Sequence, residues 1–173
     1  MAQTLYPEIV VVGASNMDLI ATVPRLPLIG ETLHGSSFAT GYGGKGANQA
    51  ACVAKLGTRC LFVGKVGNDV FGKGMLDNLN ELGLDTSGVT ITDKASSGVA
   101  PIFVEPDGKN AIIIVNGAND YLTEDDILAV EPLISKAKVS TCCTQNLFIL
   151  EVIYRSLLYN SNLNLRSHCL HFN

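Results

Sequence analysis

The residues of this chain that are best suited to chemistry form a glycine-rich run, GYGGKGAN, at positions 41–48. Four of its first six residues are glycines, which lose much conformational freedom when ordered, so we expect a tight turn or a close approach there. A helical pattern follows to residue 56, and Gly57 is a typical helix stop. A glycine loop that opens a helix presents unpaired N–H groups and the positive end of the helix dipole, which favours hydroxyl-rich or phosphorylated ligands.

A second candidate for chemistry is the polar pair Asn16 and Asp18, which follows a β-branched run at residues 9–13. That run is typical of a strand buried on both faces of an α/β sheet, and such sheets bind ligands at the carboxyl ends of their strands. Residues two apart on an extended chain point the same way, and a carboxylate accepts hydrogen bonds while an amide both donates and accepts. Taken alone, the pair is equally typical of a turn or a helix cap.

Two nucleotide-binding patterns contain glycines at spacings close to those of this run. A Walker A loop needs a glycine five positions before the Gly-Lys pair and a Ser or Thr after it, but Ala39 and Gly46 occupy these places. The dinucleotide fingerprint G-x-G-x-x-G fits at Gly41, Gly43 and Gly46, yet a polar stretch precedes it instead of a buried strand. An NAD-binding Rossmann protein therefore stays only as a remote alternative.

A longer pattern includes the glycine run. The string GGKGAN from residue 43, with Ala50, Gly57 and Gly67 at matching separations, resembles the first signature of the ribokinase (PfkB-type) family of carbohydrate kinases. Other stretches resemble the same family: VVVGASNMD at 10–18, PLIGET at 27–32, GKVGND at 64–69 and NGAN at 116–119. The resemblance runs from about residue 8 to about residue 139 and is closest to the ribokinases within the family.

The resemblance implies a fold, an activity and a set of binding residues. The fold is α/β, the amino-terminal part of a ribokinase-like three-layer sandwich with a small β-sheet lid. The activity is the ATP-dependent phosphorylation of D-ribose to ribose 5-phosphate, with Mg²⁺ and with K⁺ as activator. The positions that match the family's substrate-binding residues are Asn16, Asp18, Gly43, Gly44, Lys45 and Asn48.

The catalytic part of the family pattern has no counterpart in this sequence. The family's general base is an aspartate that ends a Gly-Ala-Gly-Asp loop, and here no glycine follows Gly117. The family's metal-linked Asn-x-x-Glu pattern occurs only as Asn78–Glu81, inside a predicted helix, where a solvated helix face explains it. We therefore assign no catalytic, cofactor-binding or metal-binding residue, and we expect the residues that bind ATP to be absent.

These absences predict a family domain that is cut short after about residue 139 and is inactive on its own. The alternative is a non-catalytic fragment that binds a pentose or regulates the enzyme. Such a fragment would form a homodimer, or a heterodimer with a full-length subunit, through the lid. Family members often dimerise there, and exposed sheet edges favour association.

The pattern along the chain places these residues on elements. Strands are expected at 9–13 and 60–64, helices at 47–56 and after Asp69, and another helix from Thr123, with Asp126 in the capping-box position. Lighter strands are expected at 20–23 and 31–40, and a hairpin at 97–105 and 110–116. These form the lid, at about 20–40 and 97–116. Pro101 lacks an N–H group, which predicts an edge strand there.

Length and composition limit the domain organisation, the partners and the location of the chain. The 173 residues allow one ordinary domain: residues 1–139 as the family part, and 140–173 as a divergent tail with one helix followed by disorder. The net charge of −4, without a basic cluster, argues against nucleic acid and anionic membranes as partners. Five cysteines in no pairing pattern, with no signal peptide, predict reduced thiols and a cytoplasmic location.

Overall fold

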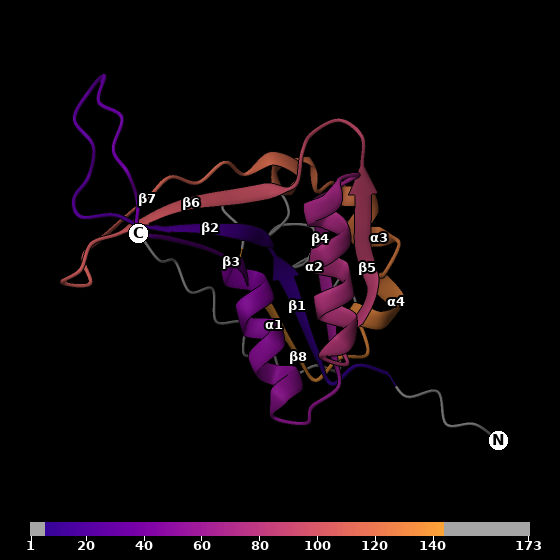
Figure 1. Ribbon diagram of the computed structural model, residues 1–173. Coiled ribbons are helices and arrows are strands. Elements are labelled where there is room, and N and C mark those ends of the chain that lie inside the picture. Colours follow the sequence, from indigo (N-terminus) through magenta and orange to yellow (C-terminus); the bar gives the residue numbers. More distant parts are fainter. Residues whose placement is uncertain (1–5, 144–173) are drawn as a thin grey trace.

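The β-branched run forms β1 (Ile9–Gly13), an inner strand of a four-stranded parallel sheet, the core sheet. The computed structural model describes residues 6–143 (Figure 1). The core sheet has the order β5-β4-β1-β8. Its other strands are β4 (Cys60–Gly67), β5 (Asp85–Thr92) and β8 (Val139–Cys143).

Helices cover both faces of the core sheet (Figure 1). Val11 points to one face, where it packs with Ala50 of α1 and Leu79 of α2. Its neighbours Val10 and Val12 point to the other face, as alternation along a strand requires, and belong to a cluster with Ile127 of α3 and Ile134 of α4. The helices are α1 (Lys45–Lys55), α2 (Val70–Glu81), η1 (Gly117–Tyr121), α3 (Glu124–Leu128) and α4 (Glu131–Ile134). The predicted three-layer α/β fold is confirmed.

A second four-stranded sheet, the lid sheet, projects from one end of the core sheet (Figure 1). Its order is β3-β2-β6-β7, and only the β2–β6 pair is parallel. Its strands are β2 (Asn16–Thr22), β3 (Ser37–Gly43), β6 (Gly98–Val104) and β7 (Asn110–Ile112). Only Ala14 and Ser15 separate β1 from β2, so one continuous stretch of chain joins the two sheets.

The lid strands differ from the segments predicted at 20–23 and 31–40. They begin at Asn16 and Ser37, and the prediction of strand structure at residues 31–36 is wrong. There the Glu31 carboxylate accepts hydrogen bonds from Arg25 Nη1 (2.7 Å) and from the Leu28 N–H (2.9 Å). These bonds hold a local loop, and they compete with strand pairing.

The prediction that Pro101 marks an edge strand is also wrong, because β6 lies between β2 and β7. The Ile113 N–H donates to Pro101 O (3.0 Å), but proline has no N–H to return the bond. Regular pairing of β7 with β6 therefore ends at Ile112, and after the single Ile113–Pro101 bond the two segments pair again at the Val99–Val115 bridge. The β6–β7 hydrogen-bond ladder accommodates Pro101 because regular pairing stops at this residue.

One core strand was missed in the sequence, and another falls on the predicted domain boundary. Residues 85–92 form β5, an edge strand, although the sequence analysis assigns no strand to them. Strand β8 pairs with β1 from Val139 to Cys143, so the boundary expected after about residue 139 falls at the start of a core strand. The helix and the disorder expected in the tail lie outside the described residues.

The predicted helix starts at Asp69 and Thr123 are confirmed. The Gly72 N–H donates to Asp69 Oδ1 (2.8 Å), which is an N-cap, and Thr123 forms a capping box with Asp126. Helix α2 ends before Gly83, whose φ of 78° favours glycine. The helix expected at 47–56 begins two residues earlier, at Lys45.

The cysteine side chains Cys52, Cys60 and Cys143 are thiols in the described part of the chain. Burial raises the pKa of the Cys60 thiol to about 11, which makes it inert. Within residues 6–143, no helix has both the length and the apolar composition to cross a membrane. The cytoplasmic location stays a prediction.

Candidate functional site

The candidate site lies where the chain passes from the core sheet into the lid sheet. Asn16 is the first residue of β2, and its partners across the strands are Gly43 on β3 and Gly98 on β6. Asp18 follows two residues later on the same face of the lid sheet, opposite Gly41. Strand pairing therefore brings Asn16 and Asp18 next to the glycine run.

The side chain of Asp18 lies directly against Gly43. A Cβ atom at Gly43 would overlap with the carboxylate of Asp18, so any other residue there would force this carboxylate to move. Partial burial raises the pKa of Asp18 above its ordinary value. No described residue donates a hydrogen bond to this carboxylate. The result is a half-buried group whose acceptor capacity is unused by residues 6–143.

The glycine run forms less of a loop than the sequence predicted. Gly41 and Gly43 belong to β3, and the turn falls on Gly44, the N-cap of α1, with a φ of 96°. A Cβ atom at Gly44 would lie 2.6 Å from Ala14 O, and one at Gly46 would lie 2.7 Å from Gly13 Cα. These glycines let the start of α1 pack against the end of β1.

Lys45 and Asn48 occupy the first turn of α1, and both are exposed. Neither side chain forms an ion pair or a hydrogen bond with another described residue. The structure thus brings four of the six predicted residues into contact, Asn16, Asp18, Gly43 and Gly44, and leaves the other two on the adjoining helix turn.

Asn119, on η1, belongs to the site although the sequence analysis gave it no role there. Its Oδ1 accepts from the Ser15 N–H (3.0 Å), and its Nδ2 donates to Ser15 O (3.1 Å) and to Asn16 Oδ1 (2.8 Å). The NGAN stretch at 116–119 marks it as a family landmark, but nothing in the spacing shows which residue it contacts.

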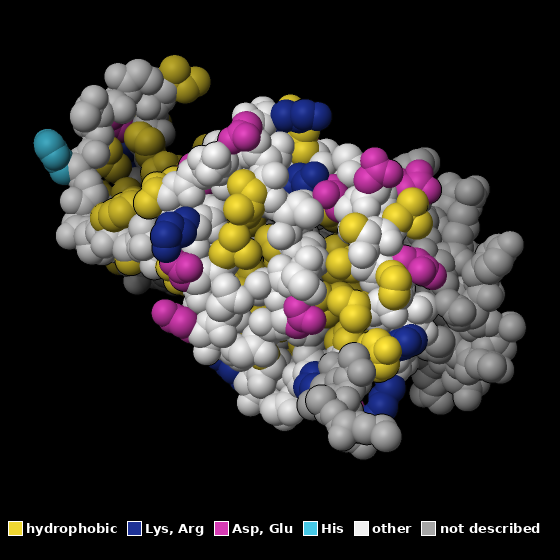
Figure 2. Space-filling model, turned by 90° about the vertical axis from the view of Figure 1, so that its right-hand side faces the viewer, with side chains coloured by type: hydrophobic (Ala, Val, Ile, Leu, Met, Phe, Trp, Pro, Cys, Tyr) yellow, Lys and Arg dark blue, Asp and Glu magenta, His cyan; other side chains and the backbone are white. Residues whose placement is uncertain are grey.

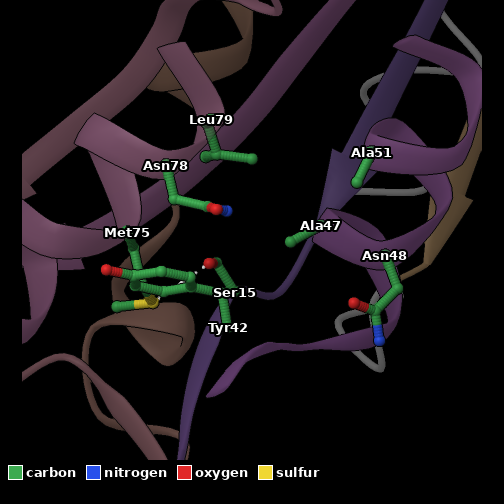
Figure 3. A pocket seen from close by; sticks show the side chains of 8 residues that line it. All are labelled: Ser15, Tyr42, Ala47, Asn48, Ala51, Met75, Asn78 and Leu79. Carbon is green, nitrogen blue, oxygen red and sulfur yellow. Dashed lines mark hydrogen bonds between the residues drawn. The ribbon is translucent and has the colours of Figure 1, made fainter. Parts of the chain in front are cut away.

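A small pocket adjoins the glycine run, between α1 and α2 (Figure 3). The Asn78 amide of α2 points toward Ala47 and Ala51 of α1. The Ser15 hydroxyl donates to Met75 Sδ (3.1 Å) at its floor. Asn78 therefore faces a gap between helices, where the sequence analysis expected a solvated helix face.

The structural context does not match a dinucleotide site. The fingerprint residues Gly41 and Gly43 lie on β3, which runs antiparallel to β2 in the lid sheet, whereas the fingerprint requires a preceding parallel strand. The space beside Gly43, Gly44 and Gly46 is filled by atoms of this chain, so these glycines leave no open cradle for a pyrophosphate group. Both observations argue against the remote Rossmann alternative.

Comparison with known proteins agrees with this architecture. Residues 7–157 match the family model described as "pfkB family carbohydrate kinase". Ribokinase of Mus musculus is 44% identical over 134 residues, covering 78% of this chain and 42% of the relative. Deoxyribokinase of Salmonella typhi is 44% identical over 120 residues, covering 69% of this chain and 39% of the relative.

A solved structure shows the same similarity. Arabidopsis thaliana ribokinase complexed with ribose and ATP matches with a TM-score of 0.80 at 32% identity. That alignment covers 91% of this chain and 52% of the Arabidopsis chain. The chain therefore spans about two fifths of the length of the curated relatives and about half of the solved one.

Proposed function

The chain belongs to the pfkB family of carbohydrate kinases, and from this premise we propose that its described residues form the sugar-binding half of a ribokinase-type kinase. The reaction of such a kinase transfers a phosphoryl group from ATP to the 5-hydroxyl of D-ribose. The observation that supports the proposal most directly is the half-buried Asp18 carboxylate, which lies over Gly43 and has no donor among the described residues.

Each residue of the proposed site has a task in holding a pentose. Asp18 accepts hydrogen bonds from sugar hydroxyls, and Asn16 lies beside it on the same face of β2. Gly43 and Gly44 supply backbone N–H groups to the sugar, and their lack of side chains lets Asp18 and the end of β1 lie close to them. Lys45 and Asn48 reach the sugar from the first turn of α1. Fixing several hydroxyls in this way orients the one that reacts.

Phosphoryl transfer itself is not assigned to these residues. The glycine positions that could approach ATP are filled by atoms of Asp18, Ala14 and Gly13, so the described site does not fit the nucleotide. Neither Mg²⁺ nor K⁺ is assigned a ligand here, and no aspartate ends a Gly-Ala-Gly-Asp loop in this sequence. We propose that the 173-residue polypeptide binds a pentose and does not phosphorylate it.

Ligand-induced stabilisation tests the sugar site. D-ribose should raise the Tm of the polypeptide, because a ligand that binds only the folded state stabilises it by mass action. The Asp18→Ala variant should lose this response, while Asp77→Ala, an exposed aspartate on α2, should keep it. An equal response in the Asp18→Ala variant would contradict the proposal. Parallel titrations with 2-deoxy-D-ribose test which pentose is preferred.

A coupled assay for ADP tests the catalytic claim separately. With D-ribose and ATP·Mg²⁺, the polypeptide should release ADP at the rate of a protein-free control. Turnover at about 1–100 s⁻¹, the usual range for kinases, would show that the chain is catalytically complete.

A second candidate function is association through the lid, either with itself or with a full-length subunit. Several large apolar side chains of the lid are exposed, among them Phe38 (68%), Ile113 (59%) and Ile114 (57%). In Figure 2, hydrophobic side chains gather on the extension at the upper left, which belongs to the lid. Exposed apolar surface of this kind typically marks an interaction site.

A further inference from the structure

The hydrogen bonds of Asn119 fix the direction of its own side-chain amide. A backbone N–H can only donate and a backbone carbonyl can only accept. The Ser15 N–H lies 3.0 Å from Asn119 Oδ1, and Ser15 O lies 3.1 Å from Asn119 Nδ2. Asn116 O, at 2.9 Å from Nδ2, gives the same direction. Exchanging the oxygen and the nitrogen of the Asn119 amide would place a donor against the Ser15 N–H. It would also place an acceptor against Ser15 O and against Asn116 O.

The direction of the Asn119 amide in turn fixes that of Asn16. Asn119 Nδ2 donates to Asn16 Oδ1 over 2.8 Å, so the oxygen of Asn16 faces η1 and cannot face a ligand. The nitrogen of the Asn16 amide is left with its two N–H groups, and no described residue accepts from them. Asn16 is 8% exposed, and its partners across the strands are Gly43 and Gly98.

The space around Asn16 prevents it from leaving this position. A Cβ atom at Gly98 would overlap with both Asn16 Oδ1 and Asn119 Nδ2, so β6 presses its backbone against this hydrogen bond. A Cβ atom at Gly44 would lie 2.9 Å from the Asn16 N. The two asparagines are therefore enclosed by glycine backbone from the lid sheet and from the start of α1.

We propose that Asn119 is a positioning residue, which holds the Asn16 amide so that it presents N–H donors to the sugar while Asp18 presents acceptors. This inference rests on the proposed function of the site. The sugar group at Asn16 must then offer an oxygen lone pair, and the group at Asp18 must offer an O–H. Adjacent hydroxyls of a neutral polyol meet both demands. A phosphate dianion offers no O–H and would be repelled by Asp18.

The Asn119→Asp substitution tests the proposal with a minimal change of shape. The new carboxylate still accepts from the Ser15 N–H, but it has no N–H for Asn16 Oδ1, so the Asn16 amide must turn and present its oxygen to the sugar. We expect D-ribose affinity to fall by about tenfold or more, as an unpaired buried polar contact implies. Asn116→Asp is the matched control, because it adds the same charge at the start of η1 and keeps the backbone carbonyl that accepts from Asn119, while the Asn116 side chain donates to Asp120 and not to Asn16.

A second variant separates positioning from folding. Asn16→Asp keeps an acceptor for Asn119 Nδ2 but replaces the sugar-facing N–H groups with an oxygen. Its urea unfolding shows whether the folded state is kept, while its D-ribose affinity should fall like that of the Asn119→Asp variant. In nuclear magnetic resonance spectra, D-ribose should shift the Asn16 side-chain N–H signals, identified by their loss in the Asn16→Asp variant, in the unsubstituted chain and in the Asn116→Asp control.

The outcomes of these experiments distinguish a failure of the proposed sugar site from a failure of the positioning role of Asn119. If the unsubstituted chain does not bind D-ribose, both the proposed function and this inference are overturned. If it binds and Asn119→Asp binds equally well, only the positioning role is wrong. If Asn119→Asp fails to fold, the Asn16→Asp affinity and the Asn16 amide signals decide. Unchanged affinity together with unshifted signals would then overturn the inference while the sugar site stands.

Discussion

At the scale of single residues, the site depends on the contact between Asp18 and Gly43. Gly43→Ala would force a methyl group against the Asp18 carboxylate, since that volume is already occupied. D-ribose affinity should fall by about tenfold or more, because displacement of a ligand-binding group by even a fraction of an ångström weakens its hydrogen bonds. Isothermal titration calorimetry gives the affinity directly.

The matched control is Gly41→Ala on the same strand. A Cβ atom there would lie 3.9 Å from Asp18 Cβ, which is an ordinary contact, so the affinity should stay close to that of the unsubstituted chain. Equal losses in both variants would show that the glycine run tolerates no side chain for some other reason, and would contradict the specific role given to Gly43.

The raised pKa of Asp18 leads to a prediction about pH. Burial disfavours the ionised form, so the contribution of this group to folding is most favourable below its ordinary pKa and declines as the pH rises through the raised value. Asp18→Asn, which carries no charge, should therefore be more stable than the unsubstituted chain at about pH 7 but not at about pH 3. Urea unfolding at both pH values measures this difference.

The Asp18→Asn variant should bind D-ribose poorly even where it is more stable. A carboxylate accepts from two hydroxyls, whereas an amide offers only one acceptor atom. If the variant is less stable at neutral pH, the half-buried carboxylate does not carry the desolvation cost that we assign to it.

The sequence sufficed for some residues of the site and not for others. Asn16, Asp18 and the glycines were predicted because they lie in short patterns whose spacing is visible in the chain. Asn119 was missed as part of the site because its partner Asn16 is 103 positions away, and the bond depends on how η1 packs beside β1 and β2. Side-chain hydrogen bonds between distant segments leave no periodic signal in a sequence.

At the scale of secondary-structure elements, Asp69 ties the start of α2 to the start of β6. Its carboxylate accepts from the Gly72 N–H (2.8 Å), the Ser97 N–H (2.7 Å) and the Ser97 hydroxyl (2.7 Å). The Gly67 N–H donates to the same hydroxyl (3.0 Å), and Ser97 is fully buried. One carboxylate thus joins a helix of the core to a strand of the lid.

Asp69→Ala should lower the free energy of unfolding by about 2 kcal/mol, since it removes an N-cap and leaves buried donors at Ser97 unpaired. Burial alone would raise the pKa of Asp69, but the hydrogen bonds from Ser97 and Gly72 outweigh it and lower the pKa. The stabilisation is therefore present above the ordinary pKa and is lost as the pH falls through the lowered value. Urea unfolding at neutral and acidic pH measures both effects.

Asp77→Ala provides the comparison on the same helix. Asp77 is exposed and pairs only with Lys73, four residues before it, so its loss should hardly change the urea midpoint. Similar midpoints for the Asp69→Ala and Asp77→Ala variants would mean that the tie between α2 and β6 contributes no stability.

The helices and strands were predicted best where residues adjacent in the sequence determine them. The helix starts at Asp69 and Thr123 depend on neighbouring residues and are confirmed. The extent of β3 and the inner position of Pro101 depend on pairing with strands elsewhere in the chain, and there the predictions are wrong. Polar edge strands such as β5 lack a strong apolar pattern, because only part of their surface is covered.

At the scale of the whole molecule, the lid sheet projects from the core sheet, and several large apolar side chains of the lid are exposed. If the proposed lid association occurs, the average mass of the polypeptide in sedimentation equilibrium should rise with concentration. Ile113→Lys should suppress this rise by placing a charge on the exposed apolar surface of the lid. Leu56→Lys, at the far end of α1 and 78% exposed, should leave it unchanged. A constant monomer mass for the unsubstituted chain would contradict association through the lid.

The proposed function depends most on the binding of a pentose at the Asp18 site. Isothermal titration of the 173-residue polypeptide with D-ribose tests this claim directly, because the measured heat requires no catalysis. We predict saturable binding of one sugar per chain that is lost in the Asp18→Ala variant. An absence of binding heat in the folded chain, or an unchanged affinity after Asp18→Ala, would contradict it.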